Sequence, residues 1–122
     1  MSQKIVVIES DQWLGDHYQQ VLERHGFLVE RASHAYSAID VIDTTIPAAI
    51  VLNIALSGAS GIALLHELQT YIDTTAIPVI VCSNLSELDG ETLRPYGVHR
   101  VLDSRVMRPD DLITAIRSAL HP

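Results

Sequence analysis

Polar residues that could do chemistry follow four of the short apolar runs in this 122-residue chain. They are Glu9-Ser10-Asp11, Asn53, Ser83 and Asp103-Ser104. Carboxylates in such a set could bind a divalent cation, and a carboxylate or a hydroxyl could act as a nucleophile. Whether these residues meet depends on the elements that carry them.

The apolar runs are typical of strands in a parallel sheet. They span Ile5 to Ile8, Phe27 to Val29, Ala49 to Ile54, Ile77 to Cys82 and Val98 to Leu102. The third and fourth runs are apolar at nearly every position, which is expected of central strands that are covered on both faces. The carboxyl ends of parallel strands lie at one edge of the sheet, where such folds bind ligands.

Segments with helical spacing of apolar residues separate the runs. The stripes are Leu14, Tyr18, Val21 and Leu22; Ala35, Ala38, Ile39 and Ile42; Ile62, Leu65, Leu68 and Ile72; and Leu112, Ile113, Ile116 and Leu120. Gly26 is a candidate stop for the first helix, Ser33 a candidate N-cap for the second, and Pro109 lies near the first turn of the last. Residues 86–96 contain Gly90 and Pro95, so we expect a short or irregular helix there.

The alternation predicts one α/β domain over residues 1–122. Its fold is a flavodoxin-like, doubly wound five-stranded parallel sheet, (βα)5, with helices on both faces.

Composition excludes several kinds of partner. The chain has 8 Lys and Arg residues against 15 Asp and Glu, a formal charge of -7, which disfavours direct contact with nucleic acid or an anionic membrane. The first apolar run is too short for a signal peptide or a membrane span, so we expect a cytoplasmic protein. Cys82 is the only cysteine and no two histidines are four residues apart, which gives no basis for a disulfide or a zinc site.

The order and spacing of these motifs resemble the receiver domain of bacterial response regulators, from about Lys4 to Leu120. In that family an acidic pair follows the first strand, and a phosphoacceptor aspartate ends the third. The fourth strand, after Ile-Pro-Val, ends in Thr or Ser, and a Lys-Pro pair ends the fifth. The matching positions here hold Glu9-Ser10, Asn53, Ser83 and Ser104-Arg105.

The resemblance implies phosphoryl transfer to the aspartate with magnesium bound nearby, and this chain departs from that chemistry at three positions. A neutral amide at Asn53 is a poor nucleophile and brings no charge to a metal. Ser10 lacks the second carboxylate, and Ser104 lacks the lysine. We therefore expect no enzymatic activity, no cofactor, and weak or absent magnesium binding. The predicted degenerate phosphoacceptor pocket comprises Glu9, Ser10, Asp11, Asn53, Ser83 and Ser104.

The switch that the family uses is also altered. The resemblance implies coupling of Ser83 to an aromatic residue on the fifth strand, but the matching residue is Val101. We expect a phosphorylation-independent module of two-component or phosphorelay signalling that binds a histidine kinase, an output protein or a second copy of itself. The family's usual contact face predicts Leu88, Leu93, Tyr96, Val101 and Ile116 as the interaction residues.

Two alternatives remain open from the residues alone. The chain could be an active receiver that uses Ser10 or Ser83 as an atypical phosphoacceptor. It could also be a flavodoxin-like domain that senses a small ligand in the pocket beside Asn53.

Overall fold

A computed structural model describes residues 3–54, 61–83 and 90–121. Its centre is a five-stranded parallel sheet in the order β2-β1-β3-β4-β5. The strands are β1 (Lys4–Ile8), β2 (Leu28–Ala32), β3 (Ala49–Leu52), β4 (Val79–Ser83) and β5 (Val98–Asp103). This strand order is the flavodoxin-like one, so the predicted fold class is confirmed.

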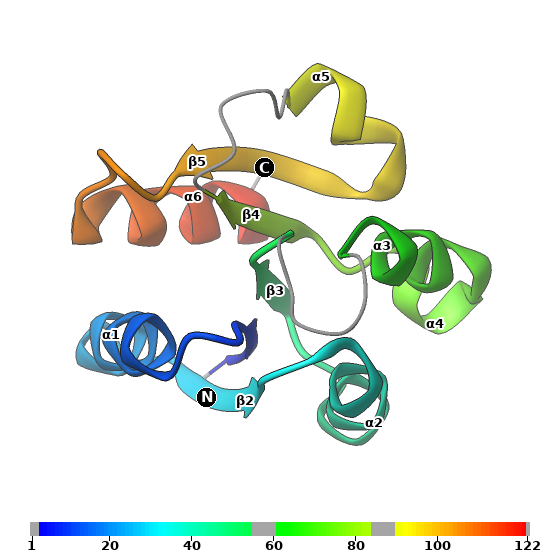
Figure 1. The fold of residues 1–122 in the computed structure, drawn as a ribbon, viewed down its shortest axis with the longest axis horizontal. Coiled ribbons are helices and arrows are strands. Elements are labelled where there is room, and N and C mark those ends of the chain that lie inside the picture. The colour runs from blue at the N-terminus through cyan, green and yellow to red at the C-terminus, as the bar shows by residue number, and fades with distance from the viewer. Residues whose placement is uncertain (1–2, 55–60, 84–89, 122) are drawn as a thin grey trace.

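Helices cover both faces of the sheet (Figure 1). They are α1 (Gln12–Arg24), α2 (Ala35–Thr45), α3 (Gly61–Thr70), α4 (Ile72–Thr75), α5 (Gly90–Leu93), the 3-10 helix η1 (Arg94–Tyr96) and α6 (Pro109–Leu120). Helices α1 and α6 lie on one face, and α2, α3, α4 and α5 lie on the other (Figure 1).

The core has two layers because successive strand residues point to opposite faces of the sheet. On β1, Ile5 and Val7 join the layer under α1 and α6, whereas Val6 and Ile8 join the layer under α2 and α3. Every residue of β3 and β4 is buried, as expected for central strands covered on both sides.

Local signals in the sequence account for several helix ends. Gly26 has a φ of 88° just after α1, which confirms it as the stop. Helix α6 begins at Pro109, and the Asp111 carboxylate accepts a hydrogen bond from the Arg108 backbone N–H at 2.8 Å. The predicted N-cap of α2 is wrong by one residue, since the Nδ1 atom of His34 rather than Ser33 accepts from the Ser37 N–H.

Two predicted helices differ in the structure. The stripe ending at Ile72 is broken because Tyr71 is extended, which ends α3 at Thr70 and starts the short α4. Ile72 therefore faces solvent instead of the core, and its predicted place in the stripe is wrong. Residues 90–96 form one α-turn and one 3-10 turn, as the Gly90 and Pro95 pattern predicts.

Candidate functional site at the carboxyl edge of the sheet

Glu9 and Asn53 follow directly after the two neighbouring central strands β1 and β3. Ile8 and Leu52 are paired in the sheet register, and the Asn53 N–H donates to the Ile8 carbonyl at 3.0 Å. The next residues after these strands therefore leave the sheet side by side. The geometry follows from the parallel pairing alone, which is why the sequence could predict that they meet.

The carboxylate of Glu9 is held by nitrogen donors. Its side chain is buried, with the residue only 3% exposed. The Asn53 side-chain Nδ2 lies 3.0 Å from both Oε1 and Oε2, and the Asp11 backbone N–H donates to Oε2 at 3.1 Å. The amide nitrogen must face Glu9, because carboxylate oxygens only accept hydrogen bonds and the amide oxygen carries no hydrogen atom to donate. A neutral side chain thus satisfies the buried carboxylate.

Asp11 and Ser10 have other roles in the structure. The Asp11 Oδ1 accepts from the Leu14 backbone N–H at 3.0 Å, so this carboxylate caps the N-terminus of α1. Ser10 is partly buried and lines a cavity of about 410 Å³ between the β1–α1 connection and β2, together with Gln12 and Arg31.

The remaining predicted pocket residues lie at the ends of β4 and β5. Ser83 is 3% exposed, and its backbone carbonyl accepts from the Ser104 N–H at 2.9 Å. Arg105 donates through Nε and Nη2 to the two oxygens of Asp103, at 3.0 and 2.8 Å. These hydrogen bonds lower the pKa of Asp103 to about 2. Arg105 is thus engaged with an exposed carboxylate beside the position where the family has its lysine.

Cys82 and Tyr18 are buried core residues close enough to Glu9 for its charge to act on them. Burial raises the pKa of Cys82 to about 12, and the negative charge of Glu9 adds to this effect. Burial also raises the pKa of Tyr18, with Cys82 and Glu9 contributing in the same direction. Both groups are therefore neutral at physiological pH, and the predicted burial of the single thiol is confirmed.

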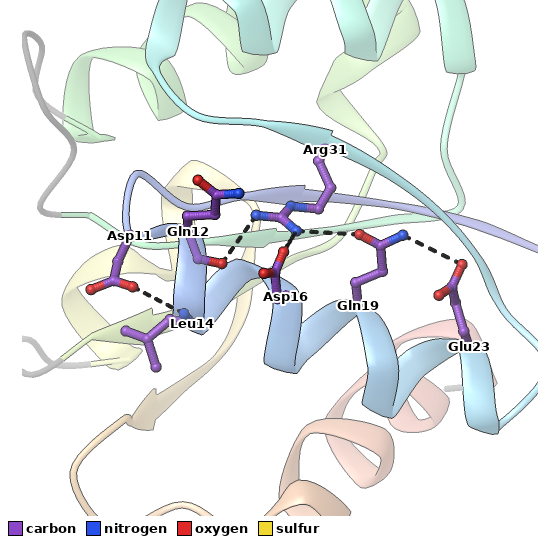
Figure 2. Close-up of polar contacts among 7 residues, drawn as sticks. All are labelled: Asp11, Gln12, Leu14, Asp16, Gln19, Glu23 and Arg31. Atoms are coloured by element: carbon purple, nitrogen blue, oxygen red, sulfur yellow. Dashed lines mark hydrogen bonds and ion pairs between the residues drawn. The ribbon is translucent and has the colours of Figure 1, made fainter.

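A polar cluster around Arg31 on α1 was not predicted from the sequence. Arg31 extends from β2 across α1, where Nη1 contacts Asp16 and Gln19 and Nη2 donates to the Gln12 carbonyl (Figure 2). A Cβ atom at Gly15 would lie 2.2 Å from Nη2, so the missing side chain makes room for the guanidinium. No local pattern could reveal this cluster, because it depends on β2 lying beside α1.

The predicted interaction face is partly wrong. Leu93 and Ile116 are core residues with 4% and 0% exposure, so neither can present its side chain to a partner. Tyr96 and Val101 are partly buried, and the Tyr96 ring packs edge-on against His66 with 4.6 Å between ring centroids. Leu88 lies outside the described residues. The prediction from the family's contact face failed at Ile116 because this residue belongs to the apolar stripe of α6 that packs on the sheet.

Within residues 3–54, 61–83 and 90–121, no three side chains of His, Cys, Asp or Glu come together as metal ligands. None of the described helices has the length and apolarity that crossing a membrane requires.

A sequence model of the response regulator receiver domain matches residues 5–117. The chain belongs to this family. It is thus a receiver domain of the kind found in two-component response regulators.

Curated relatives of this receiver domain are longer proteins. The response regulator MprA of Mycobacterium bovis is 25% identical over 99% of this chain, and the phosphate regulon transcriptional regulatory protein PhoB of Escherichia coli is 27% identical over 99%. The matched regions are 52% and 53% of those proteins, so the chain spans about half their length.

Solved structures share the fold. A CheY-like receiver domain protein from Methanospirillum hungatei superposes with a TM-score of 0.87 at 21% identity, over 98% of this chain and 94% of that one. The receiver domain of a signal transduction histidine kinase from Syntrophus aciditrophicus gives a TM-score of 0.84 at 21% identity, over 98% and 90%.

Proposed function

We propose that this receiver domain works without phosphorylation and acts by binding other proteins. The observation that carries the proposal is the contact between the Asn53 amide nitrogen and both oxygens of Glu9, at 3.0 Å each. An amide supplies no anionic oxygen to attack phosphorus. The amide also occupies the Glu9 oxygens, which in a metal site would bind the cation.

The residues present do not fit the magnesium ion that the family uses. Magnesium demands near-octahedral oxygen coordination and is usually bound through carboxylates. Glu9 accepts three hydrogen bonds from nitrogen, and the Asp11 carboxylate caps α1. Ser10 and Asn53 add no charge. We therefore propose no resident metal or other cofactor and no enzymatic activity.

The expected partners are a histidine kinase or an output protein of a signalling pathway. Receiver domains work by such contacts, and the relatives MprA and PhoB are named as regulators. A homodimer through the face around β5 and α6 has less support, because two of its five predicted residues are buried in the core. Sedimentation at high micromolar concentration tests that dimer directly.

Incubation with acetyl phosphate and magnesium, followed by intact mass spectrometry, tests the proposal. We expect no gain of mass by one phosphoryl group. A stable adduct would overturn phosphorylation independence, and repeating the reaction with Ser10→Ala and Ser83→Ala would identify either alternative acceptor. Ser83 is an unfavourable phosphoacceptor because it is almost fully buried.

Small-ligand sensing is the second candidate function, and the cavity beside Ser10 is the observation that favours it. The cavity measures about 410 Å³, and its lining includes polar side chains of Gln12, Gln19 and Arg31. A thermal-shift screen with nucleotides tests this function. A rise in melting temperature that Arg31→Ala abolishes would favour sensing over protein contact.

A further inference from the structure

A long groove separates α2 from α3 and α4. It consists of two hollows of about 280 and 450 Å³, which share Ile39 and Glu67 in their linings and so form one surface. Figure 1 places α2 beside α3 and α4 on the same face of the sheet. The groove is distinct from the pocket at Glu9 and Asn53, and neither of those residues lines it.

Exposed apolar side chains gather along this groove. Among the described residues, seven large hydrophobic side chains are exposed, and three of them line the groove. These three are Tyr36 (84%), Ile46 (74%) and Tyr71 (54%). Single exposed apolar residues are ordinary, but a contiguous set along a concavity is typical of a contact surface.

Ile46 is held in an unfavourable conformation. Its φ of 50° and ψ of 67° place a β-branched residue in the left-handed region, directly before Pro47. Glycine is the usual residue at such a helix end because it adopts this conformation without a steric penalty. The chain instead keeps a large apolar side chain there and leaves it exposed over the groove. Strain of this kind is concentrated at functional sites.

Charge selects among the occupants of the groove. Its lining includes the exposed carboxylates Asp40, Asp43, Glu67 and Asp73, and among the described lining residues there is no Lys or Arg. A second copy packed on the same groove would set acid against acid. Anionic lipid and nucleic acid would be repelled for the same reason. A partner that carries Lys or Arg beside its apolar residues is complementary.

We propose that this groove binds a basic amphipathic helix of a partner protein. Its apolar side chains pack on Ile39, Ile46 and Tyr71, and its Lys and Arg side chains face Asp43 and Glu67. A helix suits the site because the groove runs between two helices, where a third can pack ridge into groove. The proposal rests on the proposed function, that the domain acts through protein contacts.

A synthetic peptide tests the groove directly. The probe is a labelled helical peptide with Leu at positions i, i+3, i+4 and i+7 and Lys elsewhere. Fluorescence anisotropy at physiological salt gives its affinity, and NMR of the 15N-labelled domain maps the contact. We expect shifts concentrated in α2, α3 and α4. A scrambled peptide of equal composition, which is not amphipathic, should bind at least roughly tenfold more weakly.

Variants with matched controls separate the groove from general acidity. Asp43→Lys/Glu67→Lys should weaken peptide binding about tenfold or more, because both rim charges reverse. Glu23→Lys/Asp110→Lys makes the same change of net charge on exposed positions of α1 and α6, and should leave the affinity within about twofold. Ile46→Gly and Tyr71→Ser remove apolar contacts, whereas Val106→Gly removes an exposed side chain outside the groove lining.

The outcomes are distinct. Equal losses in the groove and control variants would overturn the proposal, as would NMR shifts centred outside α2, α3 and α4. Self-association of the unliganded domain that Ile46→Gly abolishes would assign the groove to a second copy instead. Binding to phosphatidylglycerol vesicles that Ile46→Gly and Tyr71→Ser abolish would assign it to a membrane. A phosphoryl adduct would contradict the proposed function whether or not the peptide binds. Failed peptide binding without an adduct would contradict only the proposal that the groove binds a helix.

Discussion

The pocket at the carboxyl edge of the sheet and the groove between α2 and α3–α4 differ in what they leave unsatisfied. In the pocket, the buried carboxylate of Glu9 accepts hydrogen bonds from two nitrogen atoms, Nδ2 of Asn53 and the backbone N–H of Asp11. In the groove, large apolar side chains such as Ile46 and Tyr71 remain exposed beside carboxylates that no lining cation balances among the described residues. At the position that the family uses for chemistry the carboxylate is satisfied by internal hydrogen bonds, whereas the groove leaves its apolar side chains exposed.

This difference has a physical basis. A buried charge is costly to leave without partners, so a buried carboxylate needs either a cation or hydrogen-bond donors. Asn53 supplies such a donor to Glu9. Exposed apolar groups carry no comparable penalty in the monomer, so a surface can keep them for a partner. Substitutions should therefore reduce stability at the pocket and reduce binding at the groove.

The largest expected effect is that of Asn53→Asp. A second carboxylate about 3 Å from buried Glu9 removes a donor and adds like-charge repulsion, so we expect a loss of roughly 2–3 kcal/mol in the free energy of unfolding. Urea denaturation at pH 7 measures it. Magnesium at millimolar concentration should return part of the loss, because the pair then has a cation to share.

The control for this substitution is an exchange of the two groups. Glu9→Gln/Asn53→Asp restores one amide and one carboxylate in contact, so the double variant should be more stable than Asn53→Asp alone. If Asn53→Asp unfolds at the same urea concentration as the native chain, the pocket is not closed by this contact and its contrast with the groove fails.

The second effect concerns Gly61, the first residue of α3, which packs against Ile54 just after Asn53. A Cβ atom there would lie 2.7 Å from both the Cα and the carbonyl oxygen of Ile54, while the Gly61 N–H donates to that carbonyl at 3.0 Å. Because the obstacle is backbone, Gly61→Ala should cost roughly 1–3 kcal/mol. Thermal unfolding measures the change.

Gly15→Ala is the matched control for Gly61→Ala. Its Cβ would meet the movable end of Arg31, so the guanidinium can swing aside, and the higher helix propensity of Ala partly offsets the lost contact. We expect the smaller loss here. A greater loss for Gly15→Ala would show that the Arg31 cluster, rather than the start of α3, sets the stability.

The sequence predicted the pocket at the carboxyl edge of the sheet but not the groove. Glu9 and Asn53 could be placed together because parallel strand pairing fixes their neighbours. The end of α1 before Gly26 and the start of α6 at Pro109 rest on local backbone chemistry, so the sequence could predict them too. The predicted strand 27–29 ends before Ala32 because the edge strand β2 alternates exposed and partly buried residues and includes Glu30 and Arg31.

The groove could not be predicted because it depends on tertiary packing. The apolar stripe of α2 correctly placed Ile42 in the core, but it said nothing of Ile46, whose left-handed backbone turns it outward. Ile72 fitted the helical period of α3, and only the extended backbone at Tyr71 removes it from that face. A period measures spacing along one helix, whereas exposure depends on where the helix ends and what lies beside it.

A smaller effect is expected at Ile46. Ile46→Gly relieves the left-handed conformation but gives the unfolded chain more freedom, so the free energy of unfolding should change by less than about 1 kcal/mol. Urea denaturation beside the peptide titration tests both halves of the comparison. A loss of stability as large as that of Asn53→Asp would show that Ile46 holds the fold together and is not kept for a partner.

The smallest effect is expected at the exposed rim of the pocket, where Arg105 binds Asp103. The pKa of Asp103 falls from 3.8 to about 2, so the folded state binds its proton less readily than the unfolded state does. The stabilisation is therefore complete above about pH 4 and is lost as the pH falls towards 2. Since both side chains lie in solvent, the gain is small and high salt should reduce it.

NMR titration of the Asp103 carboxyl carbon measures this coupling. Arg105→Ala should return the pKa of Asp103 towards 3.8, and Arg108→Ala, on a neighbouring exposed arginine, should leave it low. An unchanged pKa in Arg105→Ala would release Arg105 from the carboxylate. It would then be a cation available to the pocket, and the contrast between a closed pocket and an open groove would lose one of its supports.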